Sequence, residues 1–160
     1  MEKYIEIIDE INEAIQEFID HLNPLTLIPK LEKEKLNDTT HCWKLKEVDW
    51  NDIPFPNGNH PGIYFLFGYK QNEENILGLY IGKASVQSNI GSRLNHHLNS
   101  ALREQRRYTK SDKEGNIFEL EFVATIPLKE FPFFASSLEE YLIEVLQGKK
   151  FHLLNKVGNY

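Results

Sequence analysis

The chain has 160 residues and a mass of 18.7 kDa, the size of one domain with a substantial hydrophobic core. Hydrophobic residues make up 41% and charged residues 26%, and no apolar run approaches the roughly 20 residues that cross a bilayer. The single cysteine, Cys42, excludes an internal disulfide and a cysteine-cluster zinc site. The acidic, amphipathic start resembles neither a signal peptide nor a basic transit peptide, so we expect a cytoplasmic protein without a membrane partner.

The formal net charge of −6 is unevenly distributed. Residues 1–22 contain one basic and seven acidic residues, so they carry all of the net charge. Residues 83–110 contain a single acidic residue and six basic ones, namely Lys83, Arg93, Arg103, Arg106, Arg107 and Lys110. This basic patch suits a phosphate backbone, although a solvated basic helix face would have the same composition.

The first 22 residues are expected to form a helix. Their apolar residues recur at steps of three and four: Ile8, Ile11, Ile15, Phe18 and Leu22. This stripe either packs on the domain or pairs with a second copy of the chain. Pro24 and Pro29 end the pattern, and residues 30–60 look irregular, with a turn-rich connector over 52–62. We therefore divide the chain into an N-terminal extension, 1–59, and a domain over 60–160.

Two alternating runs predict a β-hairpin, 62–68 and 77–82, joined by the polar loop KQNEEN. Large apolar side chains such as Phe65 and Leu79 then fill one face of the hairpin. Tyr64 and Tyr80 fall together on the other face, beside Gly78 and Gly82. Such a face is open to a ligand, unless the tyrosines merely cover a helix.

Three further elements follow the hairpin. A helix should begin near Ser88, with Ser88 or Asn89 as its cap and an apolar stripe of Ile90, Leu94, Leu98, Ala101 and Leu102. Residues 116–126 alternate as a strand, and a second helix is expected over 137–147, with Gly148 as its stop. A short extended piece ends near Asn155. The order of elements predicts an α+β fold with a small mixed sheet and flanking helices.

Five short features of the sequence occur together in a characteristic order. They are the tripeptide Gly62-Ile63-Tyr64, the tetrapeptide Tyr80-Ile81-Gly82-Lys83, Arg93, Glu139 and Asn155. In this order and on these elements, they resemble the GIY-YIG endonuclease superfamily over residues 60–157. Arg93 and His97, four residues apart on one helix, are most similar to its type II restriction-enzyme branch.

The sequence departs from the family pattern in three places. The loop between the two tripeptides is a few residues longer than the commonest family spacing, in a turn where insertions are tolerated. The charged helix over 1–22 and its connector have no counterpart in the minimal family domain. No zinc finger or helix-turn-helix accompanies the domain, so the DNA-recognition modules of homing enzymes are missing.

The resemblance implies a role for each motif residue. Glu139 would be the ligand of Mg²⁺ (or Mn²⁺), with the substrate phosphate and waters completing the octahedral shell. Ser136 and Ser137 each stand three residues before a glutamate, so a capping box could instead tie Glu139 to the helix start, or Glu140 could cap and leave Glu139 free.

Tyr64 would act as the base or orient the water, with Tyr80 hydrogen-bonded near it. Because a phenol with an ordinary pKa of ~10 is a poor base at neutral pH, a nearby cation or a metal-bound water would have to favour the phenolate, and Lys83 and Arg93 can supply that field. Arg93 would clamp the scissile phosphate with its planar guanidinium group, unless it is an ordinary surface arginine.

His97 would relay a proton or bind phosphate, because adjacent His96 points about 100° away around the helix. Asn155 would fix the site or touch a phosphate, although a satisfied amide at a strand end is the alternative. His41, Cys42 and His60 stand at no metal-ligand spacing and are interpreted as structural.

The function implied is a metal-dependent endonuclease acting on duplex DNA in a restriction or phage-defence setting. The phosphate contacts would come from Lys83, Arg93, Arg103, Arg106, Arg107 and Lys110. Cutting both strands with one site per chain favours a homodimer. The alternatives are a catalytically silent nucleic-acid-binding module and a structure-selective repair or RNA nuclease.

Overall fold

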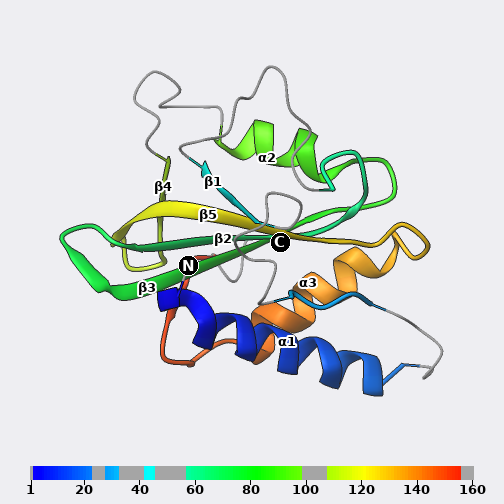
Figure 1. Cartoon of the computed structure of the whole chain (residues 1–160), viewed down its shortest axis with the longest axis horizontal. Coiled ribbons are helices and arrows are strands. Elements are labelled where there is room, and N and C mark those ends of the chain that lie inside the picture. The colour runs from blue at the N-terminus through cyan, green and yellow to red at the C-terminus, as the bar shows by residue number, and fades with distance from the viewer. Residues whose placement is uncertain (1, 23–27, 33–41, 46–56, 99–107, 156–160) are drawn as a thin grey trace.

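The computed structural model describes residues 2–22, 28–32, 42–45, 57–98 and 108–155. A mixed sheet forms the centre, with the strand order β1 (Cys42–Lys44), β5 (Ile117–Pro127), β2 (Gly62–Lys70), β3 (Glu73–Ala84) and β6 (His152–Leu153), and β4 (Tyr108–Ser111) pairs with β5 off this path. Helix α2 (Ile90–Leu98) lies on one face of the sheet, whereas α1 (Ile5–Asp20) and α3 (Phe134–Val145) lie on the other (Figure 1). The predicted α+β class is confirmed. None of the described helices is long and apolar enough to span a membrane.

The central hairpin is formed by β2 (Gly62–Lys70) and β3 (Glu73–Ala84). Its antiparallel register places Tyr64 opposite Gly82 and Leu66 opposite Tyr80, as the alternation predicted. The connection is shorter than expected, since pairing continues to Lys70 and Glu73, whose side chains form an ion pair at 2.6 Å. Asn72, at φ +68°, supplies the left-handed conformation that so tight a turn requires.

Two strands were missed in the sequence. β1 (Cys42–Lys44) falls within the region expected to be irregular and pairs with β5 (Ile117–Pro127). β4 (Tyr108–Ser111) pairs with the start of β5. Both are too short to show alternation, and backbone pairing with β5 decides their conformation. The last strand, β6 (His152–Leu153), runs parallel to β3.

The hairpin of β4 and β5 bends over the face of the sheet that carries α2. Phe118 of β5 lies against Gly78 of β3, where any larger residue would collide with its ring. The Phe118 ring also lies 5.4 Å from the ring of His152 on β6. The start of β5 therefore lies across the sheet, and the turn after β4 comes close to the far edge strand.

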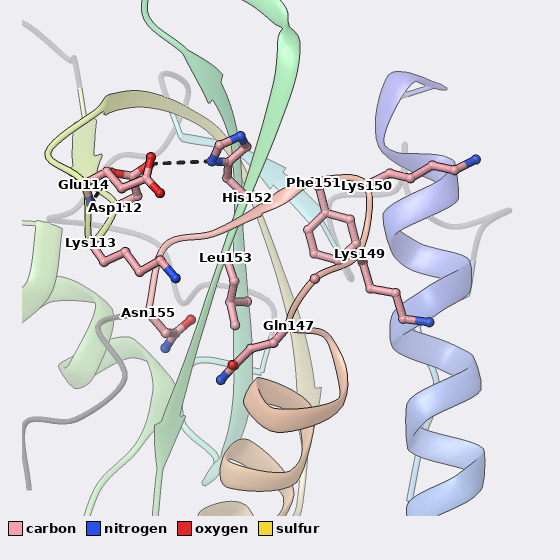
Figure 2. Close-up of a pocket in the computed structure, with 11 residues that line it drawn as sticks. Asp112, Lys113, Glu114, Gln147, Lys149, Lys150, Phe151, His152, Leu153 and Asn155 are labelled. Carbon is pink, nitrogen blue, oxygen red and sulfur yellow. Dashed lines mark hydrogen bonds and ion pairs between the residues drawn. The ribbon is translucent and has the colours of Figure 1, made fainter.

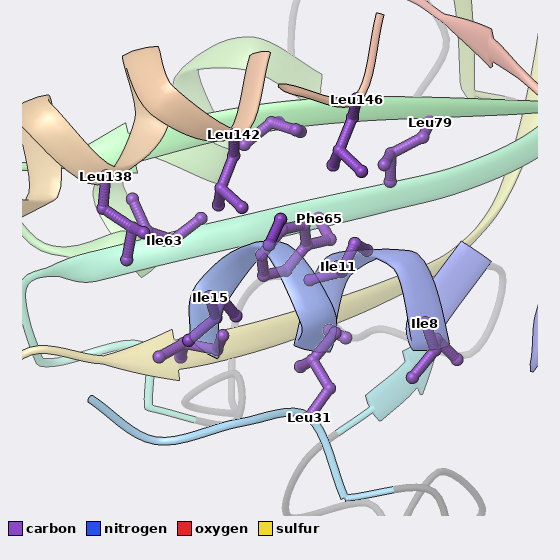
Figure 3. Close-up of a cluster of buried hydrophobic side chains, with 14 of the residues drawn as sticks. Ile8, Ile11, Ile15, Leu31, Ile63, Phe65, Leu79, Leu138, Leu142 and Leu146 are labelled. Carbon is purple, nitrogen blue, oxygen red and sulfur yellow. The ribbon is translucent and has the colours of Figure 1, made fainter. Parts of the chain in front are cut away.

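A short 3-10 helix (Glu2–Tyr4) leads into α1 (Ile5–Asp20), which is an integral part of the main core. Its apolar stripe meets Ile63, Phe65 and Leu79 from the sheet and Leu138 and Leu142 from α3 (Figure 3). Asn12 adds two 2.8 Å hydrogen bonds to the backbone of Leu31. Of the two alternatives for the stripe, packing on the domain is the one observed. The boundary between 59 and 60 stays a prediction.

The remaining helices are α2 (Ile90–Leu98) and α3 (Phe134–Val145). Asn89 caps α2, because its side-chain oxygen accepts a 2.7 Å hydrogen bond from the Ser92 amide. Ala101 and Leu102 lie outside the described residues. Gly148, at φ +75°, follows the end of α3 as expected.

The predicted start of α3 was wrong. The helix begins at Phe134, three residues early, and Phe133 caps it without a side-chain hydrogen bond. Ser136 and Ser137 therefore lie inside the first turns, and neither can form a capping box with Glu139 or Glu140. Backbone bonds from Phe134 to Phe131 and from Ala135 to Pro132 start the helix instead. The Glu139 carboxylate is thus not used to cap α3.

We expect Ile11→Ala to destabilise the domain by about 2–5 kcal/mol, because Ile11 of α1 is completely buried in the main core and its truncation leaves a cavity. The change should appear as a lower urea midpoint with an unchanged m-value. Ile5→Ala, at a site that is 37% exposed on the same helix, is the matched control and should cost far less. Equal stability of the two variants would show that α1 does not contribute to the core.

Candidate active site

Two tyrosines and a histidine form a compact aromatic cluster on the α2 face of the sheet. Tyr64 is almost fully buried against α2, so the expectation of a face open to a ligand is wrong for this residue and the alternative, a tyrosine covered by a helix, is observed. Tyr80 is half-buried, and the two ring centres lie 6.3 Å apart. The His97 ring lies 6.3 Å from the Tyr64 ring and 6.1 Å from the Tyr80 ring. The Tyr64 ring occupies the space over Gly82, where even a methyl group would collide with its hydroxyl end. Glycine at this position is therefore what allows the phenol to lie across β3.

Local packing fixes the position of α2 relative to the tyrosines. The turn before β2 accepts two backbone hydrogen bonds from the first turn of the helix, Ile90 to His60 and Gly91 to Gly58, at 3.0 and 2.8 Å. Ile90 and Leu94 then pack with Tyr64 in the second hydrophobic cluster. His97 follows Arg93 by one turn, so both reach the same side of the sheet.

Arg93 joins this cluster to the neighbouring strand. Its Nε donates a 3.4 Å hydrogen bond to the backbone oxygen of Lys83. Burial raises the pKa values of Tyr64, Tyr80 and Glu139, and the positive charge of Arg93 partly offsets each of these shifts. At His97, burial lowers the pKa and the charge of Arg93 adds to this shift. The guanidinium group is thus placed among all of the predicted acid–base groups.

Glu139 reaches the cluster from the opposite layer. It lies on α3, which covers the other face of the sheet, and its carboxylate pairs with Lys83 Nζ at 3.0 Å. Its negative charge also raises the pKa values of Tyr64 and Tyr80. Glu139 therefore lies at the end of β3 beside Lys83, close enough for its charge to act on the phenols, but it does not share their face of the sheet.

The protonation states favour neutral phenols and a neutral imidazole. Burial raises the pKa of Tyr64 well above its ordinary value, and the hydrogen bond with Tyr80 adds to this shift. Burial likewise raises the pKa of Tyr80. The expectation that the two cations favour a phenolate is therefore not met in the free chain, because desolvation outweighs the effect of Arg93.

His97 behaves in the opposite sense. Burial, Lys110 and Arg93 lower its pKa, so the imidazole is uncharged at neutral pH and keeps one nitrogen free to accept a proton. Burial raises the pKa of Glu139, although Lys83 partly offsets the shift. At neutral pH the two phenols keep their protons, so the uncharged imidazole is the group of the aromatic cluster that can accept one.

Asn155 has a defined position at the edge of β3. Its amide nitrogen donates to the Ile81 carbonyl at 2.7 Å, and its amide oxygen accepts from the Ile81 amide at 2.9 Å. These two bonds replace the pairing that β6 no longer supplies and hold the strand next to Tyr80. The alternative of a satisfied amide at a strand end describes this geometry, so Asn155 would act by positioning β3.

Lys110 enters the site in a way that sequence reasoning did not foresee. Lys110 lies on β4, and its ammonium group is 3.6 Å from the centre of the Tyr80 ring. The local sequence contains no signal for this contact, because it depends on the bend of the hairpin. Arg103, Arg106 and Arg107 lie outside the described residues, and His41 does too.

The donor set is compatible with one hard divalent cation. Among the described residues, no three His, Cys, Asp or Glu side chains gather as a metal site. Glu139 would therefore supply a single protein oxygen, and Mg²⁺ commonly binds through one or two carboxylates with waters and substrate phosphates. The contact with Lys83 shows that this carboxylate already attracts a cation. The lysine would have to withdraw for a metal to bind.

No protein-family model matches the chain, and no curated protein or solved structure is significantly similar to it.

Proposed function

We propose that the chain is a divalent-metal-dependent endonuclease that hydrolyses phosphodiester bonds of DNA. One observation carries the proposal: two phenols, an imidazole and a guanidinium group lie together, and the carboxylate of Glu139 lies close by, paired with Lys83 at the end of β3. Duplex DNA, a restriction or phage-defence setting, a cytoplasmic location and a homodimer belong to this proposal. A dimer would need a surface other than the apolar stripe of α1, which is buried within the chain.

The geometry supports a division of labour among the side chains. Arg93 would bind the scissile phosphate through its fork of N–H donors and stabilise the charge that develops on it. His97 would accept the proton of the attacking water, directly or through Tyr80. Tyr64 stays protonated because it is buried, so it would help to orient the water through its hydrogen bond with the half-buried Tyr80. Mg²⁺ bound at Glu139 would neutralise charge on the phosphoryl oxygens and lower the pKa of water.

The direct test is a cleavage assay with the purified chain on supercoiled plasmid DNA. We expect nicked and linear products in Mg²⁺ or Mn²⁺ and none in EDTA. Single-stranded DNA and RNA, assayed in parallel, would distinguish a duplex nuclease from a structure-selective repair or RNA nuclease. Absence of any product over a range of both metals would contradict the proposal.

One observation favours a second candidate, a nucleic-acid-binding module without turnover. Lys83 Nζ lies 3.0 Å from the Glu139 carboxylate, so the expected metal ligand is already neutralised within the chain. Such a module would release no product, and the substitution Glu139→Gln would leave its affinity for the same DNA unchanged. Any product that depends on Glu139 removes this candidate.

The rate of cleavage should depend on pH through His97. Protonation removes its acceptor nitrogen, and its pKa lies below the ordinary value, so activity should be retained at pH 7 and fall only below about pH 6.5. A profile of kcat/KM from pH 5 to 8 checks this. His97→Gln should lower the rate and remove the acid limb, whereas His96→Gln, on the neighbouring residue, should keep it. An unchanged acid limb in His97→Gln would exclude the imidazole as the titrating group.

A further inference from the structure

A polar hollow of about 450 Å³ lies beside the candidate active site, at the edge of the sheet formed by β6. The turn between β4 and β5 forms one wall, and the segment from the end of α3 to Asn155 forms the other (Figure 2). Figure 2 shows the side-chain ends of Lys113, Gln147 and Asn155 directed to one space, whereas Lys149 and Lys150 extend toward α1. The hollow is therefore lined by donors on the side away from α1.

The β4–β5 wall of the hollow is firmly held. The buried Asp112 carboxylate accepts hydrogen bonds from the Glu114 and Asn116 amides, each at 2.9 Å, and from the Asn116 side chain at 2.8 Å. It also lies 3.5 Å from His152 Nδ1 on the facing strand. The negative charge of Asp112 is therefore balanced by hydrogen bonds within the turn and by His152, and the carboxylate fixes the shape of this wall.

Two hydrogen-bond donors in the hollow, by contrast, make no contact that stabilises the fold. Lys113 and Gln147 are both exposed, and neither side chain has a hydrogen bond or an ion pair with another described residue. Lys149 differs, because it pairs with Glu10 of α1 at 2.6 Å. An ammonium group on one wall and an amide N–H on the other, both directed to the same space (Figure 2), are suited to oxygen atoms of a phosphate.

Two residues relate the hollow to the candidate site. Asn155 lines the hollow and also binds the backbone of Ile81, the neighbour of Tyr80. Lys110, whose ammonium group lies over the Tyr80 ring, precedes Lys113 by three residues. Because β4 ends at Ser111 and Lys113 lies in the turn, these three residues span at most about 10 Å, or about three base-pair steps of 3.4 Å along the axis of a duplex.

The charge around the hollow restricts the direction from which a polyanion can approach. The outer face of α1 presents Glu6, Asp9, Glu10 and Glu13 along a second hollow on the other side of the 149–151 segment. A nucleic acid would be repelled from that side and would reach the β3 edge from the side of Lys110 and Lys113. Glu114 stands on the same turn, and its carboxylate lies 3.5 Å from the Asn116 side chain.

We infer that this hollow is a subsite for a backbone phosphate of the nucleic-acid strand, beside the phosphate bound at Arg93, with Lys113 and Gln147 as its donors. The inference rests on the proposed function for the class of partner, a nucleic acid, but it does not require that the chain cleave that partner. The contact is to the backbone, so it adds affinity without sequence preference.

The test measures binding of a fluorescein-labelled 24-base-pair duplex by anisotropy, in EDTA so that cleavage does not interfere. Lys113→Ala should weaken binding by about three- to tenfold and reduce the slope of log K against log salt by about 1, the signature of one lost phosphate contact. Gln147→Ala should weaken binding less and leave the slope unchanged, because an amide carries no charge. Lys129→Ala, an exposed lysine between β5 and α3, is the matched control and should bind like the unmodified chain.

The outcomes separate this inference from the proposed nuclease activity. Lys113-dependent binding by a chain that cleaves nothing would support the subsite while the nuclease proposal fails. Normal affinity and slope in Lys113→Ala, with intact binding by the unmodified chain, would overturn the subsite alone. Saturable amide shifts at Gln147 with inorganic phosphate, together with unchanged duplex binding by Lys113→Ala, would assign the hollow to a free phosphate and overturn it as well. Failure of the unmodified chain to bind any nucleic acid would overturn both.

Discussion

Glu139→Gln should abolish Mg²⁺-dependent nicking of plasmid DNA, with a loss of at least about a thousandfold. A metal ion supplies several kcal/mol of charge stabilisation in the transition state, and each 1.36 kcal/mol corresponds to a factor of about ten in rate. The amide has the shape of the carboxylate but carries no charge, so it binds a divalent cation poorly. A quantitative gel assay of the fraction nicked against time measures the effect.

The same variant should fold normally. Burial raises the pKa of Glu139 in the folded chain, so the folded state binds this proton more tightly than the unfolded state does. As the pH rises past the ordinary carboxyl pKa and through the raised pKa of Glu139, ionising this carboxylate lowers the free energy of unfolding. A neutral amide does not ionise, so Glu139→Gln avoids this loss of stability. We expect a melting temperature at or above that of the unmodified chain. Lost activity together with an unfolded protein would not support a catalytic role.

Glu140→Gln is the matched control for this variant. Glu140 is the neighbouring carboxylate on α3, and it is exposed. Removing its charge changes the helix by the same amount without touching Lys83, so the rate should stay within about twofold, because surface substitutions have small effects. Equal losses in the two variants would show that the net charge of α3 matters and that Glu139 has no special place.

Much of the fold could be predicted because long apolar patterns determine it. The alternation over β2 and β3 placed Tyr64 and Tyr80 on one face, and the three-and-four spacing in α1 placed Ile11 and Ile15 in the core. The short strands β1 and β4 could not be predicted, because three or four residues carry no measurable period. The start of α3 was misplaced because two serines that look like caps lie within a helix that Pro132 and the backbone begin earlier.

The sequence could predict which motif residues lie near one another, but not how they are arranged. The motif residues of the hairpin and the two helices do lie near one another. However, Glu139 approaches from the layer opposite the tyrosines and meets them around the end of β3 through Lys83. The bend of β5 that brings Lys110 over Tyr80 depends on glycine at position 78, and only packing reveals this. Desolvation of the phenols likewise follows from burial, which a local sequence does not display.

Arg93→Ala should lower cleavage by about 10²–10³-fold, the usual cost of removing a preorganised group that stabilises developing charge. The effect should exceed that of any other single cation in the described part of the chain, because among these cations Arg93 is the one whose charge acts on Tyr64, Tyr80, Glu139 and His97 together. Its loss also removes the 3.4 Å contact with the Lys83 carbonyl, so the first turn of α2 is no longer tied to β3. Single-turnover cleavage with saturating protein measures the chemical step apart from binding.

Arg93→Lys separates the two roles of the side chain. A lysine keeps the positive charge but cannot offer two parallel N–H donors to a phosphate, so it should restore little of the rate if the guanidinium group clamps the substrate. If Arg93 acted only by lowering the pKa values of its neighbours, lysine would recover most of the activity and the acid limb assigned to His97 would stay in place. Neither substitution should destabilise α2, because Arg93 is exposed and both alanine and lysine favour helices. A fully active Arg93→Lys would therefore reassign the phosphate contact to another donor, and Lys83 and Lys110, which also contact residues of the candidate site, would be tested next.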